Sequence, residues 1–274
     1  MKPITPFWSK TTCAALIALG LAIALPAGPA TAQDAAMGLS VMQEQDRSDA
    51  GWRSVRVNGE MILMDGSGGG ISRAFELVRT ERVSRSKGDN SRMTFATPAD
   101  ISGTVLLTHG NVEPNDDSQW LYLPATGQSR RISSGNRSGK FLSSEFSFED
   151  MGGSELEDNT YGWLGAEACP GNTQLTCNVV AAYPKNSRSG YKQRVFWLDT
   201  QASRVFQTEY YNRRGQLEKR MNASGFGNHS GHWRPAMLDM VNLQTGKRTI
   251  LKWSGYNFGA RVESAELSPQ RLGN

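Results

Sequence analysis

The chain has 274 residues, of which 38% are hydrophobic and 9% aromatic, and its 30 lysines and arginines only slightly outnumber its 26 aspartates and glutamates. This apolar content is high enough to build a core, which excludes intrinsic disorder. The 29 glycines exceed the usual share of about 7% without a collagen repeat. The composition therefore favours a soluble, turn-rich β protein.

The N-terminal residues follow the order of parts found in a secretory signal peptide. Two lysines precede an apolar run at 14–25, and a small-residue site with the sequence ATA follows at 30–32. We therefore predict a signal peptide over residues 1–32, cleaved near Ala32. The apolar run is shorter than the roughly 20 residues that cross a bilayer, so we expect no stable membrane span. Without this segment the chain is almost neutral, which predicts no nucleic-acid interface.

Two cysteines, Cys169 and Cys177, remain in the exported chain, on either side of a Gly171-Asn172 turn. In an exported protein, an even pair at this distance predicts a disulfide. Such a bond would contribute roughly 2 to 3 kcal/mol by restricting the unfolded chain. The C-x-x-C spacing of redox proteins is absent, so a structural role is favoured.

In chain order, a weak helical pattern at 33–50 predicts one short N-terminal helix. From Met61 onward, apolar residues recur in short runs between glycine, asparagine and aspartate turns, which is strand spacing. These turns are too short for the crossovers of a parallel sheet. No linker divides the chain, so we predict an antiparallel sheet in a single domain over residues 33–274. The clearest predicted strands lie at 177–183, 194–198, 205–211, 217–221, 237–243 and 248–253.

The segment 103–151 carries the densest pattern of aromatic residues. Alternation places Trp120 and Tyr122 on one face of a strand, and 129–132 returns as the second arm of a hairpin. The following stretch, rich in serine and glycine, predicts a short helix or lid whose apolar side turns inward. The alternative is that its aromatic side chains simply fill the core. The apolar residues of this predicted lid are Phe141, Leu142 and Phe146.

Motifs for catalysis, nucleotide binding and metal binding are missing from the sequence. There is no G-x-S-x-G elbow, no Walker loop and no G-x-G-x-x-G motif. His229 and His232 have no cysteine or carboxylate at ligand spacing, so a loop is favoured over a metal site. The acidic pairs at 116–117 and 149–150 are adjacent residues, which point to opposite faces of a strand or are hydrated in a loop. We therefore predict a protein that is not an enzyme and needs no metal or cofactor.

Several stretches resemble a known protein family. The order GTVLLT, DDSQWLYLPATGQSRRISS and RSGKFLSSEFSFEDM within 103–151 is similar to that of the LolA-like outer-membrane lipoprotein-sorting proteins of Gram-negative bacteria. That group often occurs with RND or MMPL-type exporters. The resemblance continues through 195–220 and 233–251 and covers most of the exported chain. The family more usually has a glycine, an aspartate and a tyrosine where this chain has Ser143 or Ser144, Glu145 and Phe148.

The resemblance implies an incomplete antiparallel β-barrel of the LolA and LolB type, mainly β with some helix, in which a strongly curved sheet and short helices enclose an apolar hollow. It implies a periplasmic carrier or adaptor that passes a lipid or lipidated protein between an inner-membrane transporter of the RND or MMPL type and the outer membrane. The alternative is a structural or adaptor subunit of an envelope transporter complex that binds no lipid. The residues expected to line or gate the hollow are Trp120, Tyr122, Phe141, Leu142 and Phe146. The residues expected to brace the segment by pairing are Arg130, Arg131, Glu149 and Asp150, with Arg131 and Glu149 as the first pair to test.

Overall fold

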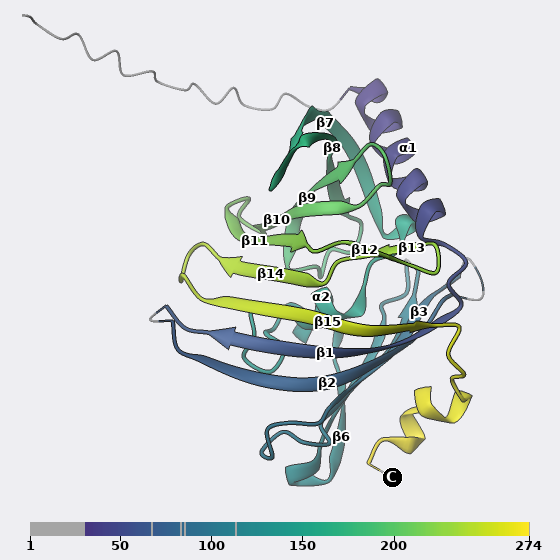
Figure 1. The fold of residues 1–274 in the computed structure, drawn as a ribbon, viewed down its shortest axis with the longest axis vertical. Helices are drawn as coiled ribbons and strands as arrows, with labels where there is room; N and C mark the ends of the chain where they lie inside the picture. The colour runs from purple at the N-terminus through teal and green to yellow at the C-terminus, as the bar shows by residue number, and fades with distance from the viewer. Residues whose placement is uncertain (1–30, 67, 83, 85, 113, 274) are drawn as a thin grey trace, which may run out of the picture.

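Thirteen strands form one antiparallel sheet (Figure 1), in the order β6-β5-β4-β3-β2-β1-β15-β14-β11-β10-β9-β8-β7. The computed structural model describes residues 31–273 except residues 67, 83, 85 and 113, so the predicted signal peptide lies almost wholly outside the described residues. The strands are β1 (Ser54–Met64), β2 (Gly70–Thr80), β3 (Lys87–Phe95), β4 (Val105–Asn111), β5 (Ser118–Leu123), β6 (Gln128–Ile132), β7 (Asn159–Cys169), β8 (Asn172–Pro184), β9 (Tyr191–Asp199), β10 (Val205–Asn212), β11 (Leu217–Ser224), β14 (Met237–Asn242) and β15 (Arg248–Phe258). A separate two-stranded sheet consists of β12 (Gly227–His229) and β13 (His232–Arg234).

The strand order follows the chain in two meanders that meet in the middle of the sheet. There β1 pairs with β15, with Met61 opposite Leu251. Because nearly every strand pairs with its neighbour in the chain, short turns suffice and no crossover is needed. The prediction of a mainly β, antiparallel fold is confirmed. The sheet is open, with β6 and β7 as its two edges, and the long connection between these edge strands runs through residues 133–158.

The predicted N-terminal helix is α1 (Ala32–Asp49), which packs along β7 near one edge of the sheet (Figure 1). Thr31 begins it with a capping box, because its side chain accepts the Asp34 amide while its own amide donates to the Asp34 carboxylate at 2.9 Å. A Cβ atom at Gly38 would stand 2.8 Å from the backbone of Gly162 in β7. Glycine therefore permits this close approach. Within the part of the chain that the structure describes, no helix is long and apolar enough to cross a membrane.

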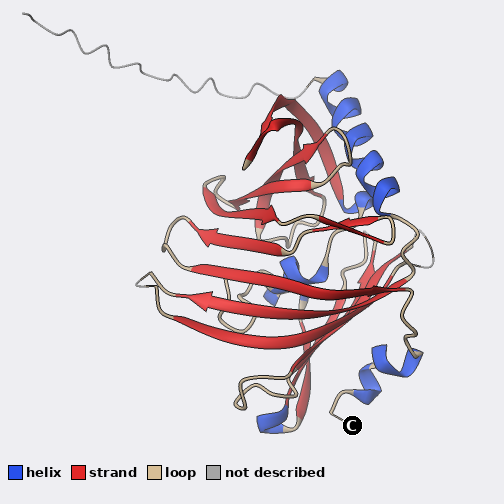
Figure 2. Ribbon diagram, in the orientation of Figure 1, coloured by secondary structure: helices blue, strands red, loops and turns tan. Residues whose placement is uncertain are grey.

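The remaining helices are short (Figure 2). They are α2 (Phe148–Gly152) and the 3-10 turns η1 (Pro124–Thr126), η2 (Ser134–Asn136), η3 (Leu156–Asp158), η4 (Ser264–Leu267) and η5 (Pro269–Arg271). The predicted short helix around Phe141 and Phe146 is thus displaced along the chain. Both residues lie in an irregular turn, and α2 begins just after it, where Ser147 caps the helix through the amide of Asp150. A serine that can accept this amide hydrogen bond starts the helix at that point rather than earlier.

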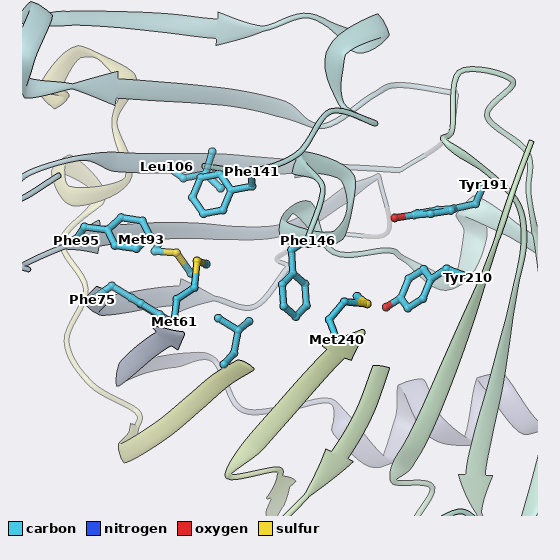
Figure 3. Close-up of a cluster of buried hydrophobic side chains, with 11 residues drawn as sticks. Met61, Phe75, Met93, Phe95, Leu106, Phe141, Phe146, Tyr191, Tyr210 and Met240 are labelled. Atoms are coloured by element: carbon cyan, nitrogen blue, oxygen red, sulfur yellow. The ribbon is translucent and has the colours of Figure 1, made fainter. Parts of the chain in front are cut away.

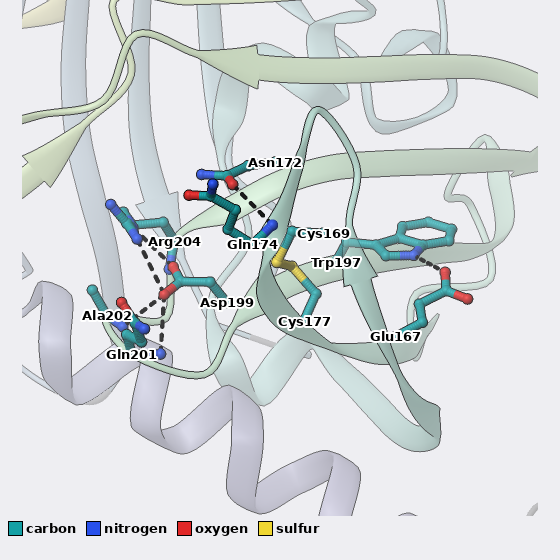
Figure 4. The surroundings of a disulfide bond; sticks show 10 residues. All are labelled: Glu167, Cys169, Asn172, Gln174, Cys177, Trp197, Asp199, Gln201, Ala202 and Arg204. Atoms are coloured by element: carbon teal, nitrogen blue, oxygen red, sulfur yellow. Dashed lines mark hydrogen bonds and ion pairs between the residues drawn. A yellow bond between two sulfur atoms is a disulfide. The ribbon is translucent and has the colours of Figure 1, made fainter.

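The predicted disulfide joins Cys169, the last residue of β7, to Cys177 in β8 (Figure 4). Both cysteines are buried and pack with Phe206 of β10. Close by, the carboxylate of Asp199 accepts hydrogen bonds from the amides of the turn that follows it and from the guanidinium of Arg204. The turn predicted after β9 is therefore held by one buried carboxylate.

The two faces of the sheet are covered by different parts of the chain. On the outer face of β3 to β5, a ring nitrogen of His109 lies 2.6 Å from the carbonyl oxygen of Leu267, and Arg92 donates to the carbonyl of Glu266 at 3.1 Å. Leu107, on the same face, is fully buried. The C-terminal turns η4 and η5 therefore cover this face. The opposite face, called the inner face below, carries the connection from β6 to β7.

Candidate functional site

The inner face of the sheet carries one large apolar cluster (Figure 3). It joins side chains of eight strands and of the connection between β6 and β7. Three of its members are methionines, whose unbranched and polarisable side chains adapt to irregular neighbours. The members are Met61, Phe75, Met93, Phe95, Leu106, Phe141, Phe146, Tyr191, Tyr210, Met240 and Leu251.

Residues 138–152, called the inner segment, lie over this cluster. Phe141 is completely buried and Phe146 is 3% exposed. The ring centroids of Phe141 and Phe95 are 6.0 Å apart, and Figure 3 shows Phe146 between Met61 and Met240. The inner segment therefore fills the interior with its own aromatic side chains.

A tight turn brings the two phenylalanines onto the same surface. The Phe141 amide donates to the Phe146 carbonyl at 2.8 Å, which closes the turn. Between them, Leu142 and Ser143 have positive φ angles of 46° and 64°. Residues with a side chain rarely adopt this left-handed conformation, which costs of order 1 kcal/mol or more. Such strained positions are common where a segment is clamped for a function.

Side chains of β2, β5 and β15 tie the backbone of the inner segment to the sheet. Arg73 of β2 donates to the carbonyl of Leu142 at 2.7 Å. The amide of Glu145 donates to the hydroxyl of Thr249 in β15 at 2.9 Å. Gln119 of β5 donates to the carbonyl of Phe148 at 2.9 Å. These bonds satisfy backbone groups that would otherwise be buried without partners.

A buried ion pair fastens the end of the inner segment. The Lys219 ammonium of β11 donates to the Asp150 carboxylate at 2.8 Å, to the Glu145 carbonyl at 3.1 Å and to the Tyr191 hydroxyl at 2.6 Å. These three contacts use all three of its donors. Burial alone would raise the pKa of Asp150, but the charge and hydrogen bond of Lys219 outweigh it, so this pKa is lowered. Burial, with the nearby Asp150 charge, raises the pKa of Tyr191 well above its ordinary value.

Two more carboxylates of the inner segment have fixed partners. Glu145 accepts Lys140 on one oxygen at 2.6 Å and the amide of Asn242 on the other at 2.9 Å. Glu149 accepts the hydroxyl of Ser189 and the backbone amide of the next residue in the loop before β9. These two carboxylates at the rim of the cluster are thus paired, while the middle of the cluster is apolar.

The structure divides the five residues expected to line one hollow between the two faces. Phe141, Leu142 and Phe146 lie on the inner face. Trp120, by contrast, packs against His109 with ring centroids 5.1 Å apart, on the face that the C-terminal turns cover. Tyr122 lies on that outer face too, beside Gly273 near the end of the chain.

This division corrects the expectation that all five residues share one surface. Both faces of β5 carry large apolar side chains, so alternation alone could not say which face is the inner one. Leu121, between Trp120 and Tyr122, is the β5 residue that packs against the inner cluster.

The predicted bracing residues also separate. Asp150 pairs with Lys219, which was not among the predicted bracing residues. Arg131 donates to Ser118 at 3.0 Å and lies over the ring of Trp120, so the structure does not bring it to Glu149. Arg130 is exposed on the edge strand β6. The sequence pattern could have identified Lys219. In β11 it lies on the same strand face as Leu217 and Met221, so a charged side chain stands between two apolar ones.

No group of three histidine, cysteine or carboxylate side chains stands at metal-binding distance among the described residues. The rings of His229 and His232 pack on Tyr256 and Phe258 respectively.

Comparisons with known proteins place this arrangement in a family. A family model described as "Uncharacterized protein" matches residues 87–274. No curated protein matches the chain. Among solved structures, an outer membrane lipoprotein-sorting protein domain from Vibrio parahaemolyticus is 33% identical, with a TM-score of 0.82, and the alignment covers 88% of this chain and all of that one.

Two further structures share the fold. A DUF1329 family protein from Desulfovibrio piger is 23% identical, with a TM-score of 0.82 over 87% of this chain and 99% of that one. A LolA superfamily protein from Nitrosomonas europaea is 18% identical, with a TM-score of 0.68 over 86% of this chain and 99% of that one. Together with the lipoprotein-sorting domain, which matches in both sequence and fold, they identify the chain as a member of the LolA-like family of outer-membrane lipoprotein-sorting proteins.

Proposed function

We propose that this protein is a periplasmic carrier that holds the acyl chains of a lipid or lipidated protein against its inner face and passes them between an inner-membrane transporter and the outer membrane. The observation that carries this proposal is the apolar cluster covered by the inner segment. Phe141 and Phe146 occupy the space that acyl chains would take. The similarity to a lipoprotein-sorting protein domain supports the same function.

The energetics require such a cover. An acyl chain of about sixteen carbons represents roughly 13 kcal/mol of transfer free energy, at about 0.8 kcal/mol per methylene group, so it does not leave a membrane unaided. A carrier must offer an equally apolar surface, and that surface must be hidden when no cargo is bound. The inner segment hides the apolar surface of the empty protein from water, because its phenylalanines take the place of the cargo.

The inner segment is built to be displaced as a unit. It belongs to the connection between the two edge strands, so its release breaks no pairing within the thirteen-stranded sheet. It is held by the burial of Phe141 and Phe146, by side-chain hydrogen bonds and by one ion pair at Lys219. In the proposed cycle the inner segment swings out and leaves a hollow around which the sheet curves. Acyl chains then enter the hollow and contact the methionine-rich inner face. Unloading follows binding to an acceptor that holds the cargo more tightly.

A second function is favoured by the same filled interior. Phe141 is fully buried, so the interior of the protein resembles an ordinary packed core. A subunit that only contacts a transporter or envelope complex through its surface needs nothing more.

Lipid analysis separates the two functions. Protein purified from periplasm without detergent is extracted with organic solvent, and the extract is analysed by mass spectrometry. The carrier function predicts acyl lipid or lipopeptide in a fixed ratio to protein, and binding of an added apolar fluorescent dye. A lipid-free protein that also fails to bind the dye supports the surface-acting subunit.

A further inference from the structure

A cavity of about 450 Å³ opens where the inner segment meets the loop before β9, the turn between β10 and β11, and the end of β14. Cationic side chains outnumber acidic ones in its lining. Its two acidic side chains are Glu145 and Glu218. Its five cationic side chains are Lys140, Arg188, Arg213, Arg214 and Lys219.

Three of these cations already have carboxylate partners. Lys140 pairs with Glu145, Lys219 with Asp150, and Arg188 with Asp116. The two remaining arginines stand on the turn between β10 and β11, and of the acidic side chains that line the cavity only Glu218 is left to balance them. This side of the cavity therefore has an excess of positive charge.

The two arginines differ in what holds them. The guanidinium of Arg213 donates to the carbonyl oxygens of Ser187 and Ser189 at 2.9 and 2.8 Å. Both acceptors are neutral, and no ion pair joins Arg213 to a carboxylate among the residues that the structure describes. Arg214 is exposed beside it, and its backbone amide donates to Asn212 at 3.0 Å. A planar guanidinium in a fixed position is well suited to bind phosphate oxygens.

The cationic cavity borders directly on the apolar cluster. Tyr191 lines the cavity and is also a member of the cluster. Lys219 lines the cavity while its ammonium lies 5.0 Å from the ring centroid of Tyr191 and 5.2 Å from that of Tyr210. One layer of side chains thus separates a positively charged opening from an apolar interior. An amphiphile with a negative head and acyl tails matches this arrangement.

We propose that this cavity binds the phosphate of an anionic phospholipid headgroup while the acyl chains of the same lipid enter the apolar interior. This inference rests on the proposed carrier function and names its cargo class. The phosphate would lie against Arg213 and Arg214, at the mouth that the inner segment leaves when it moves.

The test measures lipid uptake by the purified protein from vesicles at low salt. Phosphatidylglycerol vesicles supply an anionic headgroup, and phosphatidylcholine vesicles supply a neutral one with the same chains. We expect uptake of phosphatidylglycerol to exceed that of phosphatidylcholine by about tenfold, and Arg214→Glu to remove most of this preference. The matched control is Arg261→Glu, since the side chain of Arg261 is 89% exposed beyond the far end of β15. That variant should keep the preference within about twofold.

Further measurements show whether a negative result contradicts the headgroup site or the carrier function. Arg213→Lys keeps the charge and loses the paired carbonyl contacts, so it should retain part of the preference. Equal uptake of both lipids overturns the headgroup site and leaves the carrier function standing. Uptake of neither lipid overturns the carrier function itself. Inorganic phosphate that binds the wild type as tightly as the lipid, with loss of binding in Arg214→Glu, overturns the lipid assignment in favour of a free-anion site.

Discussion

Lys219 binds the inner segment to β11 through the Asp150 carboxylate and the Glu145 carbonyl. Its side chain is 7% exposed and that of Asp150 is 3% exposed, so each charge would be costly to bury without the other. The sequence shows a lysine between two apolar positions of a strand, which marks it as unusual. It does not show the partner, because Asp150 is 69 residues away in the chain. Pairings at that distance depend on the folded topology.

Removal of this charge gives a direct measure of the fastening. Lys219→Met should lower the free energy of unfolding by roughly 3 to 5 kcal/mol, because it leaves Asp150 buried and unpaired. Adding Asp150→Asn should restore a substantial part of the loss. Lys252→Met serves as the control, since Lys252 and Glu60 form an exposed pair 3.6 Å apart, which is worth about 1 kcal/mol or less. Equal losses in Lys219→Met and Lys252→Met, measured by urea unfolding, would contradict the anchoring role.

Phe146 tests whether the space beneath the inner segment accepts a guest. Phe146→Ala should cost about 3 to 5 kcal/mol of stability and leave room in the apolar cluster. Binding of an apolar dye should then increase several-fold. Phe206→Ala removes a similarly buried ring from the separate cluster around the disulfide, and it should destabilise the protein without increasing dye binding. Dye titrations that rise equally in both variants would show general loosening instead of a guest site.

At the scale of elements, most of the strands and their hairpin turns follow from sequence alternation. The β5 and β6 hairpin is confirmed, as are the neighbouring predicted strands 194–198 with 205–211 and 237–243 with 248–253. The irregular inner segment could not be placed in the same way. Its shape depends on positive φ angles at Leu142 and Ser143, which contacts from distant strands stabilise and which local propensity disfavours.

We expect Glu155, in the connection after α2, to make the stability of the protein depend on pH. Burial, together with the nearby Asp89 charge, raises the pKa of Glu155 from 4.5 to about 7. The folded state therefore binds this proton more tightly than the unfolded state does. The resulting stabilisation is complete below pH 4.5 and is lost as the pH rises through about 7.

Glu155→Gln isolates this effect, because the amide side chain is always neutral. Relative to the wild type, the unfolding free energy of the variant should improve by about 1 to 2 kcal/mol between pH 5 and pH 8, after allowing for partial exposure to solvent. Urea unfolding at the two pH values measures the difference. An unchanged difference between variant and wild type at both pH values would argue against a raised pKa at Glu155.

The disulfide belongs to a separate element, the hairpin of β7 and β8. Replacing Cys169 and Cys177 by alanine should lower stability by roughly 2 to 3 kcal/mol, as expected for a short closed loop. The cluster around the disulfide shares no residue with the apolar cluster of the inner face. Lipid uptake per folded molecule should therefore stay within about twofold of the wild type. Loss of uptake at temperatures where the variant is fully folded would link the disulfide to the site.

At the scale of the whole molecule, the chain joins a meander of six strands to one of seven through the pairing of β1 with β15. The antiparallel class followed from turn lengths, and the family followed from the motifs between 103 and 151. The sequence patterns did not predict the order of the two halves in the sheet or which face of the sheet is the inner one. The order of the halves depends on the pairing of β1 with β15. The outer face is the one that the C-terminal turns cover around His109, and Trp120 lies there against His109.

The central claim is that the inner segment leaves the apolar cluster when acyl chains enter it. Hydrogen exchange of the amides of Phe141 and Glu145, which donate to Phe146 and Thr249, tests this claim in the presence and absence of bound lipid. Exchange at these two amides should become at least tenfold faster on loading, while amides in the pairing of β1 with β15 remain unchanged. Lipid-loaded protein in which both inner-segment amides stay as protected as in the empty protein would contradict the claim.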